Sequence, residues 1–186
     1  SSREKILRRL VNGAKSVSEL ASEADVSPSG GQTKVLDDLV HAGFVAREKG
    51  INPQTGKLLR LERFRVKDNY VRFYLNFVEP RKSAIEAGLF KFSSMEQFHG
   101  WETVLGLQFE NLVLNHIQDF LPLLGLENVL VLSAAPFTKR SSKTGPGFQI
   151  DLLIQTQRSM LVVEIKRRKE ISHGIIDEVE RKVKLL

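Results

Sequence analysis

Apolar positions in the first part of the chain recur at the spacing of short helices. In residues 4–14 they return every three or four residues, which predicts a first amphipathic helix. Ser16 followed three residues later by Glu19 is a capping-box pattern, in which each side chain satisfies a backbone N–H of the other residue. This pattern predicts a short second helix over about residues 17–24.

A third helix and a hairpin are expected next. Ser27 suits the N-cap and Pro28 the first helical position, and Gly43 suits a left-handed turn at the end of the helix. The segments "FVARE" and "LLRLERFRV" flank the turn-rich "GINPQTGK", and their alternation predicts two paired strands. Three short helices followed by a hairpin make a winged helix-turn-helix domain, which we assign to residues 1–67.

A winged helix offers two surfaces to DNA, because its third helix normally enters the major groove and its hairpin, the wing, contacts phosphates. The start of the third helix presents the polar residues Ser29, Gln32, Thr33 and Lys34. The full set of candidate DNA-binding residues is Lys34, Arg47, Lys49, Lys57, Arg60, Arg63, Arg65, Arg167 and Arg168. A protein-docking role is the alternative, and Asp37 and Asp38 in the third helix favour it.

Residues 68–100 are expected to be a helical connector that begins with Asp68 as a cap and breaks at Pro80. A second connector helix is expected over residues 82–90. Four aromatic residues follow the cap at helical spacing, which is typical of a packed core seam joining two domains. They are Tyr70, Phe73, Tyr74 and Phe77.

The remaining half, residues 101–186, reads as helix, three strands and helix. The predicted elements are a helix over 101–121, strands over 128–133, 148–154 and 160–166, and a final helix over 174–186. A basic loop is expected at 138–147. His116 falls in the apolar stripe of the first of these helices, where a histidine is usually a core residue.

Three charges interrupt the last two apolar strands, and a hairpin would bring them together. With a turn at Gln157-Arg158, paired residue numbers sum to 315, so Asp151 faces Glu164 on one side of the sheet. Lys166 lies two residues farther on and points to the same side. Two opposed carboxylates are unfavourable unless a cation lies between them, so this register predicts a divalent-metal site.

The order of these segments resembles the core of the PD-(D/E)xK nuclease superfamily. More narrowly, "FRVKDNYVRFYLNFVEP", "GLQFENLV", "QIDLLI" and "VVEIKRR" are similar to the C-terminal half of a prokaryotic AAA+ ATPase family. The resemblance implies an α+β fold in which a restriction-endonuclease-like domain with a small mixed sheet follows the winged helix. It also implies an ATPase module upstream and a core strand after the last helix.

The resemblance assigns site residues one by one. Its metal ligands fall on Glu110, Asp151 and Glu164, and its catalytic lysine on Lys166, with Mg²⁺ or Mn²⁺ as the cofactor. Ile150 stands where the motif has its nominal proline. The chain has no phosphate-binding loop of the G-x-x-x-x-G-K-[ST] type, so it is expected to bind no nucleotide.

Composition and charge narrow the function classes. The chain has 186 residues, a net charge of +6 and no cysteine, which excludes disulfides and thiolate metal sites within it. Seven basic and two acidic residues lie between Arg47 and Lys67, which suits a polyanionic partner. No apolar run is long enough to cross a membrane. We therefore expect a cytoplasmic protein, an oligomer being compatible with the sequence.

Three functions are consistent with these patterns. The first is a metal-dependent nuclease domain guided to DNA by the winged helix. The second is a non-catalytic module that binds DNA or protein and regulates the attached ATPase. The third is a soluble domain on which Asp151, Glu164 and Lys166 merely form a salt-bridged face.

Overall fold

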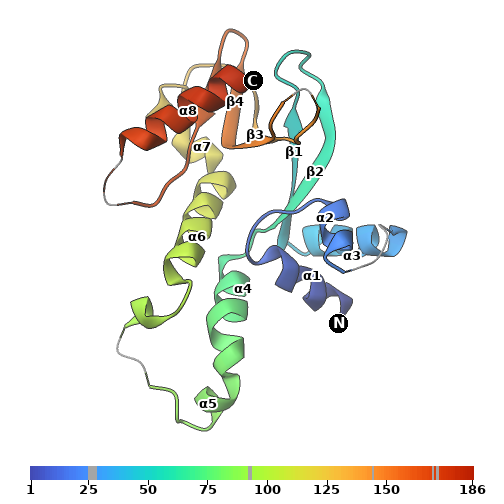
Figure 1. The fold of residues 1–186 in the computed structure, drawn as a ribbon, viewed down its shortest axis with the longest axis vertical. Helices are drawn as coiled ribbons and strands as arrows, with labels where there is room; N and C mark the ends of the chain where they lie inside the picture. The colour runs from blue at the N-terminus through green and yellow to red at the C-terminus, as the bar shows by residue number, and fades with distance from the viewer. Residues whose placement is uncertain (25–28, 92–93, 144, 169, 171) are drawn as a thin grey trace. The chain divides into compact units, whose positions relative to one another are not determined.

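The computed structural model describes residues 1–24, 29–91, 94–143, 145–168, 170 and 172–186 (Figure 1). The chain divides into two compact units. The N-terminal unit comprises Ser1–Arg47 and Arg63–Gln108, and the C-terminal unit comprises Glu48–Glu62 and Phe109–Leu186. The outer part of the wing thus groups with the C-terminal half, and residues 101–108 group with the N-terminal unit.

Three helices build the core of the N-terminal unit, as the sequence predicts. They are α1 (Ser2–Leu10), α2 (Val17–Ser22) and α3 (Gly30–His41). Figure 1 shows these three helices beside one another. Leu10, Leu20 and Leu36 are fully buried in the core that the helices share. The capping box of Ser16 and Glu19 is confirmed by both of its hydrogen bonds.

The ends of α3 follow local chemistry. Its cap is Ser29, whose hydroxyl accepts a hydrogen bond from the backbone N–H of Gln32. The predicted cap Ser27 and the proline at 28 lie outside the described residues. Gly43 adopts a φ of 80°, which confirms the left-handed turn predicted after the helix.

The wing is a hairpin of β1 (Val45–Ile51) and β2 (Leu58–Val66). Its base carries Phe64, which is buried in the N-terminal core and pairs with Lys15 in an isolated bridge. Its outer part has a different environment, since Leu59 packs against the buried cluster of Phe137 and Phe148 in the C-terminal unit.

Gly50 also lies at this close contact. A Cβ atom there would stand 3.2 Å from the Pro136 carbonyl oxygen and 3.2 Å from a methyl carbon of Leu59. The outer wing is therefore part of the C-terminal core rather than a free arm.

The connector is one winding segment of short helices within the N-terminal unit. It comprises α4 (Asn69–Phe73), a π-helical turn (Tyr74–Val78), a 3₁₀ turn (Glu79–Arg81) and α5 (Lys82–Glu86). Pro80 lies in the 3₁₀ turn, where its missing N–H is tolerated. The predicted second helix is shorter than expected and ends at Glu86.

The aromatic stripe is only partly a core feature. Phe73 and Phe77 pack with Phe98 and Trp101 in one cluster of the N-terminal unit. Tyr70, predicted to belong to the same seam, is 67% exposed. The stripe thus forms a core within this unit, instead of the seam between domains that the spacing suggested.

Among the described residues of the N-terminal unit, Arg72 is the most deeply buried charge, at 2% exposure. Its guanidinium donates to the carbonyl oxygens of Val11 at 3.2 Å, Val66 at 3.2 Å and Leu107 at 2.9 Å. These carbonyls belong to the end of α1, the end of β2 and the helix α6 (Trp101–Asn115). One side chain therefore joins three separate segments of the unit.

The predicted helix over 101–121 is broken in two. After α6, His116 has a φ of −127° and a ψ of 35°, which are not helical, and a short α7 (Ile117–Phe120) and a 3₁₀ turn (Pro122–Leu124) follow. The prediction of His116 as a core residue is wrong, because its side chain is 55% exposed and lies 3.4 Å from the carboxylate of Asp119.

The C-terminal unit is built on a sheet of order β3-β4-β5, packed with the final helix α8 (His173–Leu185). The strands are β3 (Val131–Lys139), β4 (Phe148–Thr156) and β5 (Met160–Val163). The described pairs are antiparallel, which differs from the predicted mixed sheet. β3 also extends to Lys139, into the stretch predicted as a loop, with a register shift at Pro136.

The predicted strand register is confirmed. Leu152 pairs with Val163 and Gln155 with Met160, so that the paired residue numbers sum to 315. Thr156 closes the turn, because its hydroxyl accepts hydrogen bonds from the backbone N–H groups of Arg158 and Ser159. A threonine thus supplies the turn chemistry that glycine or asparagine usually provides.

Replacing Arg72 with methionine tests its role in the N-terminal unit. The change leaves buried carbonyl oxygens without their hydrogen-bond donor, so we expect the free energy of unfolding to fall by about 3 kcal/mol or more. Urea unfolding followed by circular dichroism measures the effect. Lys82→Met, at an exposed position of α5, is the matched control and should cost less than about 0.5 kcal/mol. Equal midpoints for the two variants would contradict the assignment.

Candidate functional site

Asp151 and Glu164 meet where the β4–β5 ladder ends. The last ladder pair is Leu152 with Val163, and the next position along β4 is Asp151. Its carboxylate accepts a hydrogen bond of 2.9 Å from the backbone N–H of Ile165. A side chain thus takes the place of a backbone acceptor, and β5 stops one residue before Glu164.

Lys166 joins the two carboxylates, as the register predicts. Its ammonium nitrogen lies 2.5 Å from Oε1 of Glu164 and 3.7 Å from Oδ2 of Asp151. The Glu164 side chain is only 4% exposed and that of Lys166 is 33% exposed. The structure therefore brings Asp151, Glu164 and Lys166 together on one side of the sheet.

A second lysine, which the sequence analysis missed, completes this charge cluster. Lys182 of α8 lies 2.6 Å from Oε2 of Glu164 and 3.0 Å from Oε1 of Glu178, and its side chain is 7% exposed. Lys182 lies on the buried side of α8, while the apolar residues Ile176 and Val183 are exposed. The spacing of Lys182, three residues after Val179 and four after Glu178, was the signal that could have found it.

The surroundings shift the pKa values of both carboxyl groups in opposite directions. Burial raises the pKa of Asp151, and the charge of Glu164 adds to that rise. Burial alone would also raise the pKa of Glu164, but the hydrogen bonds from Lys166 and Lys182 outweigh it and lower the pKa. Glu164 is thus held as a carboxylate, and Asp151 is the more easily protonated member of the pair.

Glu110, the third predicted metal ligand, does not form a metal-binding group with Asp151 and Glu164. In the described part of the chain, no three histidine, cysteine, aspartate or glutamate side chains lie close enough to share a metal ion. Glu110 itself is half-buried on α6. The predicted convergence of three carboxylates is therefore corrected to a pair of carboxylates with two lysines.

An apolar cavity of about 200 Å³ adjoins the cluster. Its lining includes Phe109 and Val113 of α6 together with Glu164 and Lys166. Lys166 thus borders a recess that has room for a small group beside Glu164.

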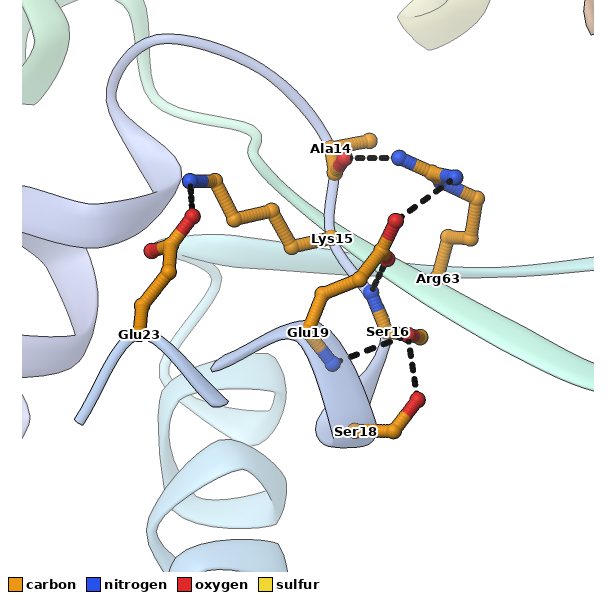
Figure 2. A network of polar contacts seen from close by, with 7 residues as sticks. All are labelled: Ala14, Lys15, Ser16, Ser18, Glu19, Glu23 and Arg63. Atoms are coloured by element: carbon orange, nitrogen blue, oxygen red, sulfur yellow. Dashed lines mark hydrogen bonds and ion pairs between the residues drawn. The ribbon is translucent and has the colours of Figure 1, made fainter. Parts of the chain in front are cut away.

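Some of the candidate DNA-binding residues of the wing make contacts within the protein, and others are exposed. Arg63 donates to the carbonyl of Ala14 and lies 3.6 Å from the carboxylate of Glu19, next to the capping box of α2 (Figure 2). Arg65 is buried. Neither is placed to meet a phosphate, because each is held inside the N-terminal unit.

Two more wing residues are ion-paired on the surface. Arg47 pairs with Asp37 and lies over the ring of Phe64, and Lys49 lies 2.8 Å from the carboxylate of Glu62. The remaining candidates are exposed: Lys34, Lys57, Arg60, Arg167 and Arg168. Lys169, which continues the last basic run, lies outside the described residues.

Glu164→Gln tests the electrostatics of the cluster. Removing one partner of a buried ion pair should lower the free energy of unfolding at neutral pH by about 3 kcal/mol. Because the folded-state pKa of Glu164 is lowered, its contribution is present above the ordinary carboxyl pKa and is lost as pH falls through the lowered value. The difference from the wild type should therefore shrink in acid.

Urea unfolding at several pH values measures this difference. Glu180→Gln, at an exposed position of α8, is the control and should behave like the wild type. A Glu164→Gln deficit that stays constant into acid would show that lost packing, not lost charge, causes it.

Comparisons with known proteins find few similar chains. No known family model matches the chain. An uncharacterized protein from Methanocaldococcus jannaschii is 27% identical over 165 residues, which cover 88% of this chain and 35% of that protein. The chain thus spans about a third of the relative that it matches.

Two solved structures of bacterial proteins show a weak likeness, each with a TM-score of 0.34 over 68% of this chain. They are the adhesin competence repressor AdcR from Streptococcus pyogenes, at 15% identity and 80% coverage of that chain, and a mutant of ZitR from Lactococcus lactis, at 17% and 73%.

In the described residues, no helix is long and apolar enough to span a membrane.

Proposed function

We propose that the chain is a DNA-binding module that acts through its winged helix. The observation that carries this proposal is the exposed first turn of α3 in an otherwise complete winged-helix core. Thr33 and Lys34 are exposed there, while Leu36 and Leu39 hold the opposite face in the core. A helix fixed in this way can place its first turn in the major groove.

The acidic residues of α3, which favoured protein docking, are compensated. Asp37 pairs with Arg47 of β1, and Asp38 lies 2.6 Å from the guanidinium of Arg3 on α1. Opposite charges at this distance reduce the negative potential that α3 would otherwise present to phosphates. This pairing removes the main electrostatic objection to DNA binding.

The exposed residues Lys34, Lys57 and Arg60 are the proposed phosphate contacts. Lys34 belongs to α3, Lys57 lies in the wing turn, and Arg60 lies on β2. Arg63 and Arg65 leave this set because they serve the core. The proposed interface is therefore smaller than the sequence suggested, and weak sequence preference is expected from so few side chains near base edges.

The salt dependence of DNA affinity tests the proposed contacts. Each lost phosphate contact should reduce the slope of log affinity against log salt by about 0.9. We expect Lys57→Gln and Arg60→Gln each to weaken binding to all duplexes alike and to flatten this slope. Fluorescence anisotropy with labelled duplexes measures both effects.

Lys82→Gln removes the same charge from α5 and serves as the control. A wild-type chain that shows no duplex affinity at low salt would refute the DNA-binding proposal. The winged helix would then be a protein-docking surface, as the alternative holds.

A second function, metal-dependent phosphodiester hydrolysis, is favoured by one observation: Asp151, Glu164 and Lys166 lie in one cluster. The donor chemistry fits Mg²⁺ or Mn²⁺, since these ions are often held by one or two carboxylates together with substrate phosphates. Asp151 and Glu164 would hold the ion, and when bound it would offset charge on a phosphate under attack. Glu110 has no assigned role in this arrangement.

Lys166 would act on the substrate itself. Its partly exposed ammonium at the edge of the cavity can donate to a phosphate oxygen or to the attacking water. Burial raises the pKa of Asp151, and a bound cation would favour its charged form. Both roles need the carboxylate pair that the 315 register creates.

Two variants separate these roles. Asp151→Asn should abolish both Mn²⁺ binding and cleavage, because it removes a ligand oxygen charge. Lys166→Met should keep Mn²⁺ binding and lose cleavage, since it removes a contact made in the transition state. Calorimetry measures binding, and a gel assay on single-stranded, duplex and branched DNA measures cleavage.

Lys184→Met, at an exposed position of the same unit, is the control for these variants. Cleavage by Asp151→Asn at the wild-type rate would refute the hydrolytic proposal. Absence of cleavage by the wild-type protein would leave the DNA-binding, regulatory role as the function. The upstream ATPase that would be regulated remains a prediction of the sequence resemblance.

A further inference from the structure

We propose that Lys182 is a built-in counter-cation that competes with a divalent metal ion for Glu164. The proposal rests on the second function proposed above and concerns the regulation of that site. In the state described here, α8 would hold the site closed to metal. Binding of a divalent ion would require the Lys182 ammonium to leave Glu164.

The two oxygens of Glu164 are already occupied by lysines. Lys166 lies 2.5 Å from Oε1, and Lys182 lies 2.6 Å from Oε2. A divalent ion bound to this carboxylate therefore has to displace an ammonium group or be repelled by it at close range. The site is compensated without a metal, which lowers its affinity for one.

Lys182 is the lysine that can leave at the smaller cost. Lys166 lies beside Asp151 and Glu164, and both of these carboxylates are proposed metal ligands. Lys182 instead has Glu178 as a further partner at 3.0 Å, one turn away on α8. Its side chain can give up Glu164 and keep an ion pair with Glu178, which is 39% exposed.

This geometry gives Lys182 two alternative partners, so Glu178 also influences the competition between Lys182 and the metal ion. With Glu164 free, Lys182 would bridge to Glu178 only, as an ordinary i,i+4 pair. With Glu178 removed, Lys182 would have Glu164 as its remaining partner in the cluster and hold it more firmly. The two residues of α8 should therefore affect metal affinity in opposite directions.

Metal binding to three variants of the whole chain tests the proposal. Lys182→Gln should bind Mn²⁺ about tenfold more tightly than the wild type, the factor expected for losing one charge-assisted competitor. Glu178→Gln should bind Mn²⁺ more weakly. Lys184→Gln, two residues away and exposed, should be unchanged. Calorimetry and the Mn²⁺ paramagnetic resonance signal measure affinity directly, without any activity assay.

Thermal unfolding provides a second readout. Lys182→Gln should lower the melting temperature of the metal-free protein, because Glu164 loses a partner, and excess Mn²⁺ should restore more of it than in the wild type. Lys182→Met, which keeps an apolar stem, replaces the glutamine variant if the latter does not fold. Adding Asp151→Asn to either variant should abolish the gain in affinity.

The possible results separate this proposal from the metal site on which it rests. Tighter binding by Lys182→Gln together with weaker binding by Glu178→Gln supports competition. Mn²⁺ binding by the wild type that is equal or weaker in Lys182→Gln overturns the role of Lys182 and leaves the metal site standing. Lack of Mn²⁺ binding in the wild type and in every variant overturns both.

Discussion

The C-terminal unit is organised around the need to compensate one buried carboxylate. Glu164 is 4% exposed, and a charge in that position is tolerated only when opposite charges and hydrogen-bond donors surround it. Lys166 meets this need from the same segment after β5, and Lys182 meets it from α8. The position of α8 against the sheet thus follows from the charge of Glu164 as well as from apolar packing.

The N-terminal unit solves a similar problem by another route. Arg72 is buried, and its guanidinium donates to three backbone carbonyls, which carry no net charge. The planar guanidinium spreads five donors over three nitrogens and so can reach carbonyls on separate segments, whereas a lysine carries its three donors on a single nitrogen. The N-terminal unit therefore has a buried arginine that links three segments through hydrogen bonds, and the C-terminal unit has a buried ion-pair cluster. Only the second offers carboxylates to a ligand.

Local patterns carried the predictions that the structure confirms. The period of two along β4 and β5, together with the length of their turn, was enough to bring Asp151 to Glu164. The capping box of α2 and the turn at Gly43 likewise depend only on neighbouring residues. Such features are decided by the chain within a few residues, so the sequence alone reveals them.

The failures involve partners that are far apart in the sequence. Lys182 reads as a solvated helix residue until α8 is seen against Glu164. Arg63 reads as a phosphate contact until its pairing with Ala14 and Glu19 is seen (Figure 2). The segment "SAAPFTK" lacks the alternation of apolar and polar residues that predicts a strand. It becomes part of β3 because it pairs with β4. Tertiary context overrides local preference in each case.

The division of the wing between the two units has a consequence for how the protein can be dissected. The chain passes from one unit to the other after Arg47, after Glu62 and after Gln108. A single cleavage therefore cannot yield two intact pieces: a fragment ending after the wing would take Leu59 away from Phe137 and Phe148. The outer wing is made early in synthesis but finds its core partners only when the C-terminal half has been made, which ties the folding of the two halves together.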